Sequence, residues 1–278
     1  MKRVWLSLSI LAALVSAGVG CAGSETGNSA QPREKHPVSI EMRLTASGPG
    51  LTSTDQGGTV FTLASAFAAV ERIDLVLPAG VECEGLPGEV QAYSAACDTD
   101  DHVRIEGPWV VDLVSGEFEP ALAGIDVLDG VFDRIDMKLS PGAAGTGGIE
   151  RGDALDGATL DVSGTAELGG SAARLFGLTL AFNVKSRFED GNAIAIGEDA
   201  DTVELSFDVS DWFATLDLGD CIAADEVPTI DGVLRLEGAD RRACGDVEKA
   251  VRRALSGTGK AKVVSHGPDS GESDNEDD

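Results

Sequence analysis

Apolar and polar residues alternate along much of this 278-residue chain. Val38, Ile40, Met42 and Leu44 alternate with polar residues. The same alternation, or a short apolar run typical of a strand, recurs at 60–63, 70–77, 103–106, 109–114, 131–139, 160–162, 176–184 and 203–209. A period of two is typical of strands that bury one face. We therefore expect a mainly β protein, an antiparallel β-sandwich of immunoglobulin or transthyretin-like type.

Turn residues separate these segments. Gly107-Pro108 stands between two predicted strands, and Pro141-Gly142 follows another. The Gly-rich run at 143–148 predicts a boundary, either between domains or between the sheets of one domain. We expect one β-sandwich part over 38–142 and a second over 149–257, which form either two domains or one continuous sandwich.

One segment near the C-terminus has helical spacing. Val247, Val251 and Leu255 fall on one stripe, Asp246 stands at the N-cap position, and Gly257 follows the last apolar residue. This pattern predicts a single short C-terminal helix.

Both ends of the chain differ from its middle. Lys2 and Arg3 precede an apolar run over 4–15 and then small residues, the layout of a secretory signal peptide. That run is shorter than the roughly 20 apolar residues that a membrane-spanning helix needs. We expect 1–20 to be a cleaved signal peptide, 21–37 a flexible tether, and 258–278 a disordered acidic tail.

Gly18-Val19-Gly20-Cys21 resembles the lipobox of bacterial lipoproteins, in which the Cys receives a diacylglycerol and becomes the new N-terminus. Gly18 departs from the Leu usual at that position. The resemblance implies that Cys21 is lipidated and anchors the chain to a membrane. Ala22, where Asp would retain a lipoprotein in the inner membrane, implies sorting to the outer membrane, facing the periplasm or the cell surface. The alternative is that Cys21 forms a disulfide.

The cysteine count agrees with a lipidated Cys21. The chain has five cysteines, and an odd number in a secreted protein needs an explanation. Lipidation leaves Cys83, Cys97, Cys221 and Cys244, which can form two disulfides in an oxidising compartment. Three pairings are open, and the local one joins Cys83 to Cys97 and Cys221 to Cys244. The absence of Cys-x-x-Cys and the presence of only three His argue against zinc.

The chain is strongly acidic, with a formal net charge of −27. Such a chain is repelled by nucleic acid and by anionic lipid headgroups, so we exclude nucleic-acid binding. A solvated acidic surface is the favoured explanation of this charge, and cation binding is the alternative.

Two acidic clusters are candidate calcium ligands. They are Asp98, Asp100 and Asp101, and Glu198, Asp199 and Asp201. Neither cluster has the spacing of an EF-hand loop, because Val103 stands where a loop beginning at Asp98 needs Gly. Asp is also a common turn residue, which favours solvated turns over metal sites.

The sequence offers little catalytic machinery. His102 is the only His between the tether and the tail, and no Gly-x-Ser-x-Gly accompanies it. No Gly-rich phosphate loop precedes a helix. Carboxylates are too abundant to single out a pair, although a hydrolase would need two of them about 5–9 Å apart in a pocket. We expect no catalytic residue and no cofactor.

Three segments resemble a family of uncharacterised Gram-negative lipoproteins that carry a β-sandwich domain of unknown function. They are 70–77 (VERIDLVL), 111–114 (VDLV) and 130–135 (GVFDRI). The resemblance implies a fold and a location but no activity. We therefore expect a membrane-anchored envelope lipoprotein that acts as a non-catalytic binding, adhesive or structural module, with an unidentified envelope or extracellular partner. The alternatives are a calcium- or metal-binding envelope protein and a secreted hydrolase with a carboxylate pair.

Overall fold

The structure is a computed structural model that describes residues 35–48, 50–80, 95–99, 101–122, 125–128, 130–191, 193–197 and 202–265. All of these residues belong to one compact unit, Arg33–Asp278. The unit is mainly β, with two short α-helices and a large sheet, so the predicted β-sandwich class is confirmed. The two predicted parts, 38–142 and 149–257, share this unit and one sheet.

Seventeen strands are present in the described residues. They are β1 (Lys35–Thr45), β2 (Thr52–Thr54), β3 (Val60–Val76), β4 (Ala95–Thr99), β5 (His102–Asp112), β6 (Phe118–Glu119), β7 (Ile125–Leu128), β8 (Gly130–Phe132), β9 (Arg134–Leu139), β10 (Leu160–Glu167), β11 (Arg174–Leu180), β12 (Val184–Glu189), β13 (Ile194–Ile196), β14 (Thr202–Asp208), β15 (Thr229–Ile230), β16 (Val233–Arg235) and β17 (Thr258–Val264). Fifteen of them form one sheet, whose main order is β15-β16-β11-β10-β3-β9-β12-β17-β14-β1-β7. The remaining two, β8 and β13, pair with each other.

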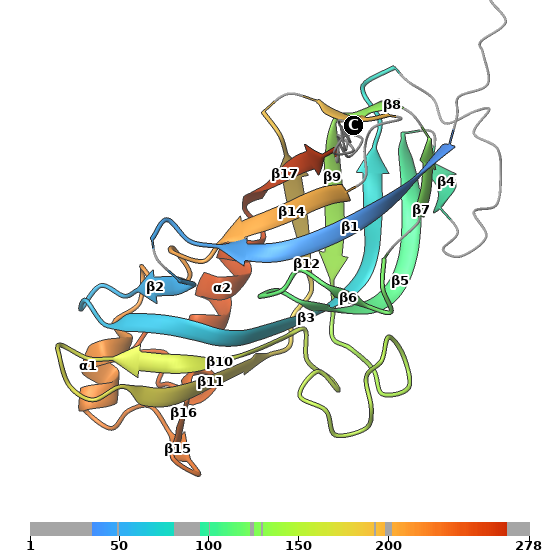
Figure 1. The fold of residues 1–278 in the computed structure, drawn as a ribbon. Helices are drawn as coiled ribbons and strands as arrows, with labels where there is room; N and C mark the ends of the chain where they lie inside the picture. The colour runs from blue at the N-terminus through green and yellow to red at the C-terminus, as the bar shows by residue number, and fades with distance from the viewer. Residues whose placement is uncertain are drawn as a thin grey trace, which may run out of the picture. The chain divides into compact units, whose positions relative to one another are not determined.

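Strand β3 joins the two halves of this sheet (Figure 1). Its N-terminal half pairs with β10, and its C-terminal half pairs along the same edge with β9. The opposite edge pairs first with β2 and then with β5. The partners change near a register shift between Val70 and Arg72, an irregularity of the kind that bends a strand.

The predicted turn at Gly107-Pro108 is wrong, because β5 runs through both residues. They lie opposite the register shift in β3, where the hydrogen-bond ladder is interrupted. Pro108 therefore loses no ladder bond by lacking an N–H group. A Cβ on residue 107 would lie 2.7 Å from the carbonyl oxygen of Glu71, so the close approach of β5 to the bent strand requires Gly.

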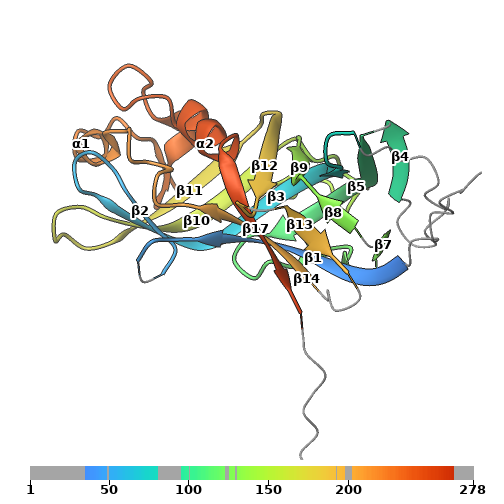
Figure 2. The same ribbon diagram turned by 90° about the horizontal axis from the view of Figure 1, so that it is seen from above.

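The sheet folds back on itself to make two layers. Backbone N–H groups of Ile40, Met42 and Leu44 in β1 donate to carbonyls of the segment that follows β5, at 2.7–3.1 Å. Figures 1 and 2 show β1 and β14 lying across the layer that contains β3 and β9. Met42 and Ile73, from opposite layers, are both fully buried in the one large hydrophobic core.

The predicted tail is wrong at its start, because Thr258–Val264 forms β17. This strand lies between β12 and β14, antiparallel to β14 and parallel to β12. Two further pairs, β1 with β14 and β11 with β16, are also parallel. The sandwich is thus not purely antiparallel, since several connections cross over before the chain returns.

Strand β1 begins at Lys35, so the predicted tether overlaps its first three residues. The rest of the predicted signal peptide and tether, and the tail beyond residue 265, lie outside the described residues.

The predicted C-terminal helix is confirmed as α2, Val247–Leu255. The Asp246 side chain accepts a hydrogen bond from the backbone N–H of Lys249 at 3.0 Å, and Val247, Val251 and Leu255 are buried. The shorter helix α1, Leu218–Ala223, and a 3₁₀ turn, Leu236–Gly238, were not predicted. No helix among the described residues is long and apolar enough to cross a membrane.

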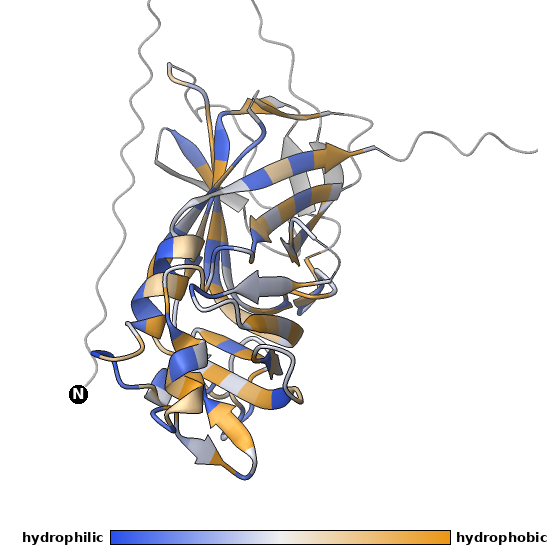
Figure 3. Cartoon of the chain, turned by 90° about the vertical axis from the view of Figure 1, so that its left-hand side faces the viewer, coloured by the Kyte–Doolittle hydropathy of each residue, from blue (hydrophilic) through white to orange (hydrophobic). Residues whose placement is uncertain are grey.

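Aromatic side chains fill the core under β10 and β11. Phe61 lies edge-on to Phe176 and to Phe213, with ring centroids 5.6 and 4.8 Å apart. Figure 3 shows hydrophilic and hydrophobic residues alternating along the strands, which is the pattern from which the sequence predicted them.

Candidate functional site

The structure describes only some of the predicted site residues. Cys97 and Asp98 lie in β4, where the backbone alone is described, and Asp101 lies in an exposed turn. The residues outside the described part are Cys21, Cys83, Asp100, Glu198, Asp199 and Asp201. The lipidation of Cys21, the Cys83–Cys97 disulfide and both calcium clusters therefore stay predictions.

The disulfide between Cys221 and Cys244 is confirmed, with the two Cα atoms 5.7 Å apart. Cys221 lies in α1, and Cys244 lies in the loop that leads to α2. Both residues are buried. The bond closes a segment of 23 residues that contains β15, β16 and the 3₁₀ turn. A loop of this length gives a disulfide about 3 kcal/mol of stabilisation in the chain-entropy model.

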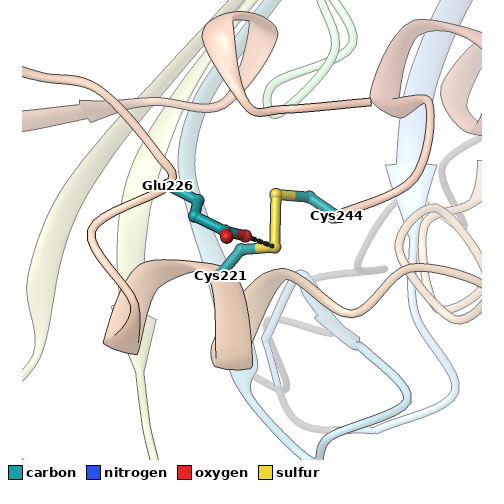
Figure 4. Close-up of side chains that lie close together, drawn as sticks. All are labelled: Cys221, Glu226 and Cys244. Carbon is teal, nitrogen blue, oxygen red and sulfur yellow. Dashed lines mark hydrogen bonds between the residues drawn. A yellow bond between two sulfur atoms is a disulfide. The ribbon is translucent and has the colours of Figure 1, made fainter. Parts of the chain in front are cut away.

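Glu226 lies beside this disulfide (Figure 4). Its Oε2 atom is 3.4 Å from the sulfur of Cys221. The chain brings it there because the N–H of Glu226 donates to the carbonyl of Cys221 at 2.9 Å, just past the end of α1. Among the described residues, the two sulfurs and this carboxylate are the one group of three possible metal-ligand atoms within 4.8 Å of one another. In the disulfide form, the sulfurs are not thiolates and do not bind a metal as such.

A buried carboxylate holds α1 in place. Asp55 accepts hydrogen bonds from the N–H of Thr59 at 2.8 Å and from the N–H of Gly219, in the first turn of α1, at 2.7 Å. Asp217 stands at the N-cap position but its side chain makes no capping bond. Asp55 therefore supplies the cap from a distant part of the chain.

Charged side chains form a row across four strands on the outer face of the sheet. Arg104 of β5 lies opposite Asp74 of β3, Asp74 opposite Asp136 of β9, and Asp136 opposite Arg187 of β12. We call these four residues the ion-pair row. Its two carboxylates are buried, with side-chain exposures of 5% and 1%. Buried charges of like sign at opposite positions need cations close by to stay ionised.

Asp74 has a cation on each carboxylate oxygen. Arg104 Nε donates to Oδ1 at 2.7 Å, and Arg72 Nε lies 3.3 Å from Oδ2 without hydrogen-bond geometry. His102 lies nearby, with Nδ1 2.9 Å from Asp101 Oδ1 and Nε2 3.0 Å from Arg104 Nη2. A ring that donates through Nδ1 to Asp101 and accepts at Nε2 from Arg104 satisfies both contacts. His102 thus begins strand β5 and contacts Arg104, the arginine that binds Asp74.

Asp136 contacts three cations. Arg134 Nε donates to Oδ1 at 3.2 Å, Lys185 Nζ lies 2.9 Å from Oδ2, and Arg187 Nε lies 3.7 Å from Oδ1. These side chains cover the carboxylate, although each cation remains partly in solvent. The Asp74–Asp136 pair is therefore a pair of neighbouring carboxylates whose oxygens are already occupied by protein cations.

Two outlying carboxyl groups have lowered pKa values. A hydrogen bond from Lys138 at 2.6 Å lowers the pKa of Glu71, against the opposing effect of burial. At Asp208, burial disfavours the charged form, but hydrogen bonds from Ser210 and Ser47 lower its pKa overall. In both cases, the pKa is lowered by hydrogen bonds from neighbouring residues near the protein surface.

An open groove of about 390 Å³ lies on the outer face of β3, β10, β11 and β16. Its lining combines Leu175 and Val233 with small residues of β3 and β10, and includes Asp161 and Arg235. Leu175 is 57% exposed, which is high for an apolar residue of a sheet. The groove contains neither member of the carboxylate pair.

Arg235 lies across the groove, above Gly177. A Cβ on residue 177 would lie 3.0 Å from Arg235 Nη1, so the absence of a side chain there lets the guanidinium lie close to β11. Arg235 is only partly exposed, and its guanidinium has no ion pair or hydrogen bond among the described residues. By contrast, Asp161 accepts a hydrogen bond from Thr179 at 2.7 Å. The groove therefore presents apolar surface beside an unpaired cation.

Glu226, Arg235 and the Asp74–Asp136 pair were not among the predicted site residues. The alternation placed Asp74 and Asp136 on outward faces, but an outward position does not specify a partner on another strand, and no strand was predicted at Arg235. Glu226 follows Cys221 by five residues, a spacing that carries meaning only once α1 is known to end between them.

No family model and no curated protein matches this chain. Among solved structures, MbnP from Methylosinus trichosporium is similar to it at 11% sequence identity, covering 84% of this chain and 100% of that chain, with a TM-score of 0.36. A likeness of this size assigns no function.

Proposed function

We propose that this chain is an exported lipoprotein, anchored to the outer membrane through Cys21, whose folded domain is a non-catalytic binding module. The observation that carries the binding role is the groove beside Arg235. Its apolar lining and single unpaired guanidinium suit a ligand that joins an apolar chain to a carboxylate. The half-burial of Arg235 strengthens such a pair relative to one in open solvent.

The net charge of the chain limits what this groove binds. A charge of −27 repels anions at long range, but salt screens exposed charges beyond about 8 Å at physiological ionic strength. A small carboxylate that reaches Arg235 meets this cation and one carboxylate of the groove, Asp161, whereas an anionic bilayer meets the whole acidic surface. The groove therefore favours a small amphipathic carboxylate over an anionic lipid surface.

Decanoate, studied by NMR with the ¹⁵N-labelled mature chain carrying Cys21→Ala, tests this role. We expect amide shifts along β11 and β16, and at least tenfold weaker binding by Arg235→Gln, because the charged partner is lost. Arg174→Gln is the matched control, since Arg174 lies at the start of β11 outside the groove lining and hydrogen-bonds only to Thr229. Equal shifts with decanol, unchanged binding by Arg235→Gln, or no shifts at all would contradict the proposal.

The disulfide supports the proposed location. Disulfides persist in oxidising compartments, and Cys221–Cys244 is buried within the folded domain. Expression of the full chain beside Cys21→Ala, followed by membrane fractionation and intact mass, tests the anchor. We expect a membrane-bound chain that carries acyl mass and a soluble variant. A soluble chain without acyl mass would end the lipoprotein proposal and leave a freely secreted protein.

The carboxylate pair of the ion-pair row supports a stabilising role more than a hydrolytic one. Asp74 and Asp136 both have cations on their oxygens and little exposure to solvent. A general acid or base needs an oxygen within hydrogen-bond reach of the substrate proton. In this arrangement, the cations occupy that position.

A further inference from the structure

The disulfide region holds the atoms of a second kind of site. The sulfurs of Cys221 and Cys244 and the carboxylate of Glu226 lie within 4.8 Å of one another. The two cysteines are buried, whereas Glu226 is exposed, and its carboxylate lies beside the disulfide (Figure 4). No described cation pairs with Glu226, which leaves its oxygens available to another ligand.

The distances fit a tetrahedral divalent metal with one adjustment. With Zn–S near 2.3 Å and Zn–O near 2.1 Å, a tetrahedral zinc places two sulfurs about 3.8 Å apart and a sulfur and an oxygen about 3.6 Å apart. The Cys221 sulfur is already 3.4 Å from Glu226 Oε2. The Cys244 sulfur lies within 4.8 Å of the carboxylate, and the two sulfurs need to separate from bonding distance by roughly 1.7 Å, a movement that side-chain rotation supplies.

Contacts other than the disulfide hold these three residues together. Asp55 caps α1, the N–H of Glu226 donates to the carbonyl of Cys221, and the N–H of Asp217 donates to the carbonyl of Cys244 at 3.4 Å. Both cysteines also belong to the large hydrophobic core. Opening the disulfide therefore removes one of several connections between α1 and the loop that leads to α2.

We propose that reduction of the Cys221–Cys244 disulfide converts this group into a binding site for a thiophilic divalent metal of the zinc class. A dithiol reductant supplies two electrons and two protons, which cleave the S–S bond to two thiols, and leaves as its own disulfide. Metal binding then releases two protons as both thiols become thiolate ligands. Glu226 is the third protein ligand, and water completes the four positions.

Charge explains why a metal, and not the bare dithiol, fits this place. Two thiolates beside the carboxylate of Glu226 would bring three negative charges together in a strongly acidic chain. A divalent cation cancels most of that charge, and the acidic surface raises its local concentration. This inference is independent of the proposed groove and of the lipid anchor.

Alkylation mapping of the whole chain tests the site. The protein is reduced with a phosphine, incubated with or without Zn²⁺ at one equivalent per chain, and pulsed with iodoacetamide before peptide mass analysis. We expect zinc to slow alkylation of Cys221 and Cys244 at least tenfold. Glu226→Gln should lose most of this protection, and Glu237→Gln, an exposed control with the same charge change, should keep it.

A spectroscopic measurement guards against effects of unfolding. In a chain with Cys21→Ala, Cys83→Ser and Cys97→Ser, Co²⁺ should produce a thiolate-to-cobalt charge-transfer band only after reduction, at one ion per chain. Circular dichroism before and after reduction reports whether the fold persists. The absence of zinc protection and of the cobalt band, or equal protection in Glu226→Gln, would overturn the proposal.

Discussion

At the scale of single residues, the buried carboxylates show how charge is accommodated in this fold. Asp136 is 1% exposed and contacts three cations. A second carboxylate, Asp74, lies opposite it on the neighbouring strand. Each carboxylate is stable there only because its attraction to its own cations exceeds the repulsion between the pair. The two residues and their cations therefore act as a unit, and removing one member leaves the charges of the others less well compensated.

Asp136→Asn should destabilise the protein by about 2 kcal/mol. This is less than the loss of one partner from a fully buried ion pair, because the cations around Asp136 are partly solvated. The loss of repulsion toward Asp74 offsets part of this effect but does not reverse it, since Asp136 contacts three cations. The midpoint of urea unfolding measures the change. Asp133→Asn is the control, because Asp133 pairs with Arg134 but is 60% exposed. Equal stability of the two variants would contradict this account.

The Glu71–Lys138 pair should stabilise the fold only above acidic pH. The folded-state pKa of Glu71 lies below its ordinary value of 4.5, so the unfolded chain binds the proton more tightly. The stabilisation is therefore complete above the unfolded pKa and is lost as the pH falls through the lowered folded value. Glu71→Gln should lower stability by about 0.5 kcal/mol at pH 7, the magnitude of a partly exposed pair.

The same comparison at pH 3 should give a smaller difference between Glu71→Gln and the unaltered chain. Glu117→Gln, an exposed residue without an ion pair among the described residues, should change stability at neither pH. Urea midpoints at the two pH values measure both effects. A difference that grows on acidification would contradict the assigned sign.

At the scale of elements, most of the long strands and the helix α2 were predictable, because their periodicity is local. Strand pairing was not. β3 changes partners near Val70, and the predicted turn at Gly107-Pro108 is instead the part of β5 that crosses this irregularity. Gly and Pro signal a turn when only neighbours in sequence are considered, but opposite an interrupted ladder they continue a strand. The candidate site shows the same limit, since its pairs join residues on different strands.

Strand β17 shows a second limit of local patterns. Thr258–Val264 contains two lysines and two glycine or alanine residues, so little apolar character marks it as a strand. Its small residues are required by the neighbours, because a Cβ on Gly259 would lie 2.6 Å from a ring carbon of Phe188. Propensity is thus overridden by the packing of a central strand against its partners.

Truncation separates β17 from the acidic residues beyond it. A chain that ends at Val264 should keep the melting temperature of the full chain. A chain that ends at Gly257 should lose cooperative unfolding, because β12 and β14 each lose a paired strand. Circular dichroism during heating measures both. Cooperative melting of the shorter chain near the temperature of the longer one would contradict a structural role for β17.

At the scale of the whole molecule, excess negative charge opposes folding. The chain has 48 acidic and 21 basic residues, and several of its cations are committed to the ion-pair row and its neighbours. Compaction brings the remaining carboxylates closer together. Added salt screens this repulsion, since the Debye length falls from about 10 Å at 0.1 M to about 3 Å at 1 M.

The melting temperature should therefore rise with NaCl, and by the same amount with choline chloride at equal ionic strength, because screening does not depend on the identity of the cation.

Calcium distinguishes this screening effect from the calcium-binding alternative. Carboxylates that merely repel one another respond to millimolar CaCl₂ as to NaCl of matched ionic strength. Carboxylates that form a site give a larger shift, which saturates as the site fills. Differential scanning fluorimetry with the three salts measures the difference. We expect no excess shift with calcium, and a saturating excess would instead favour a cation-binding role for the acidic loops.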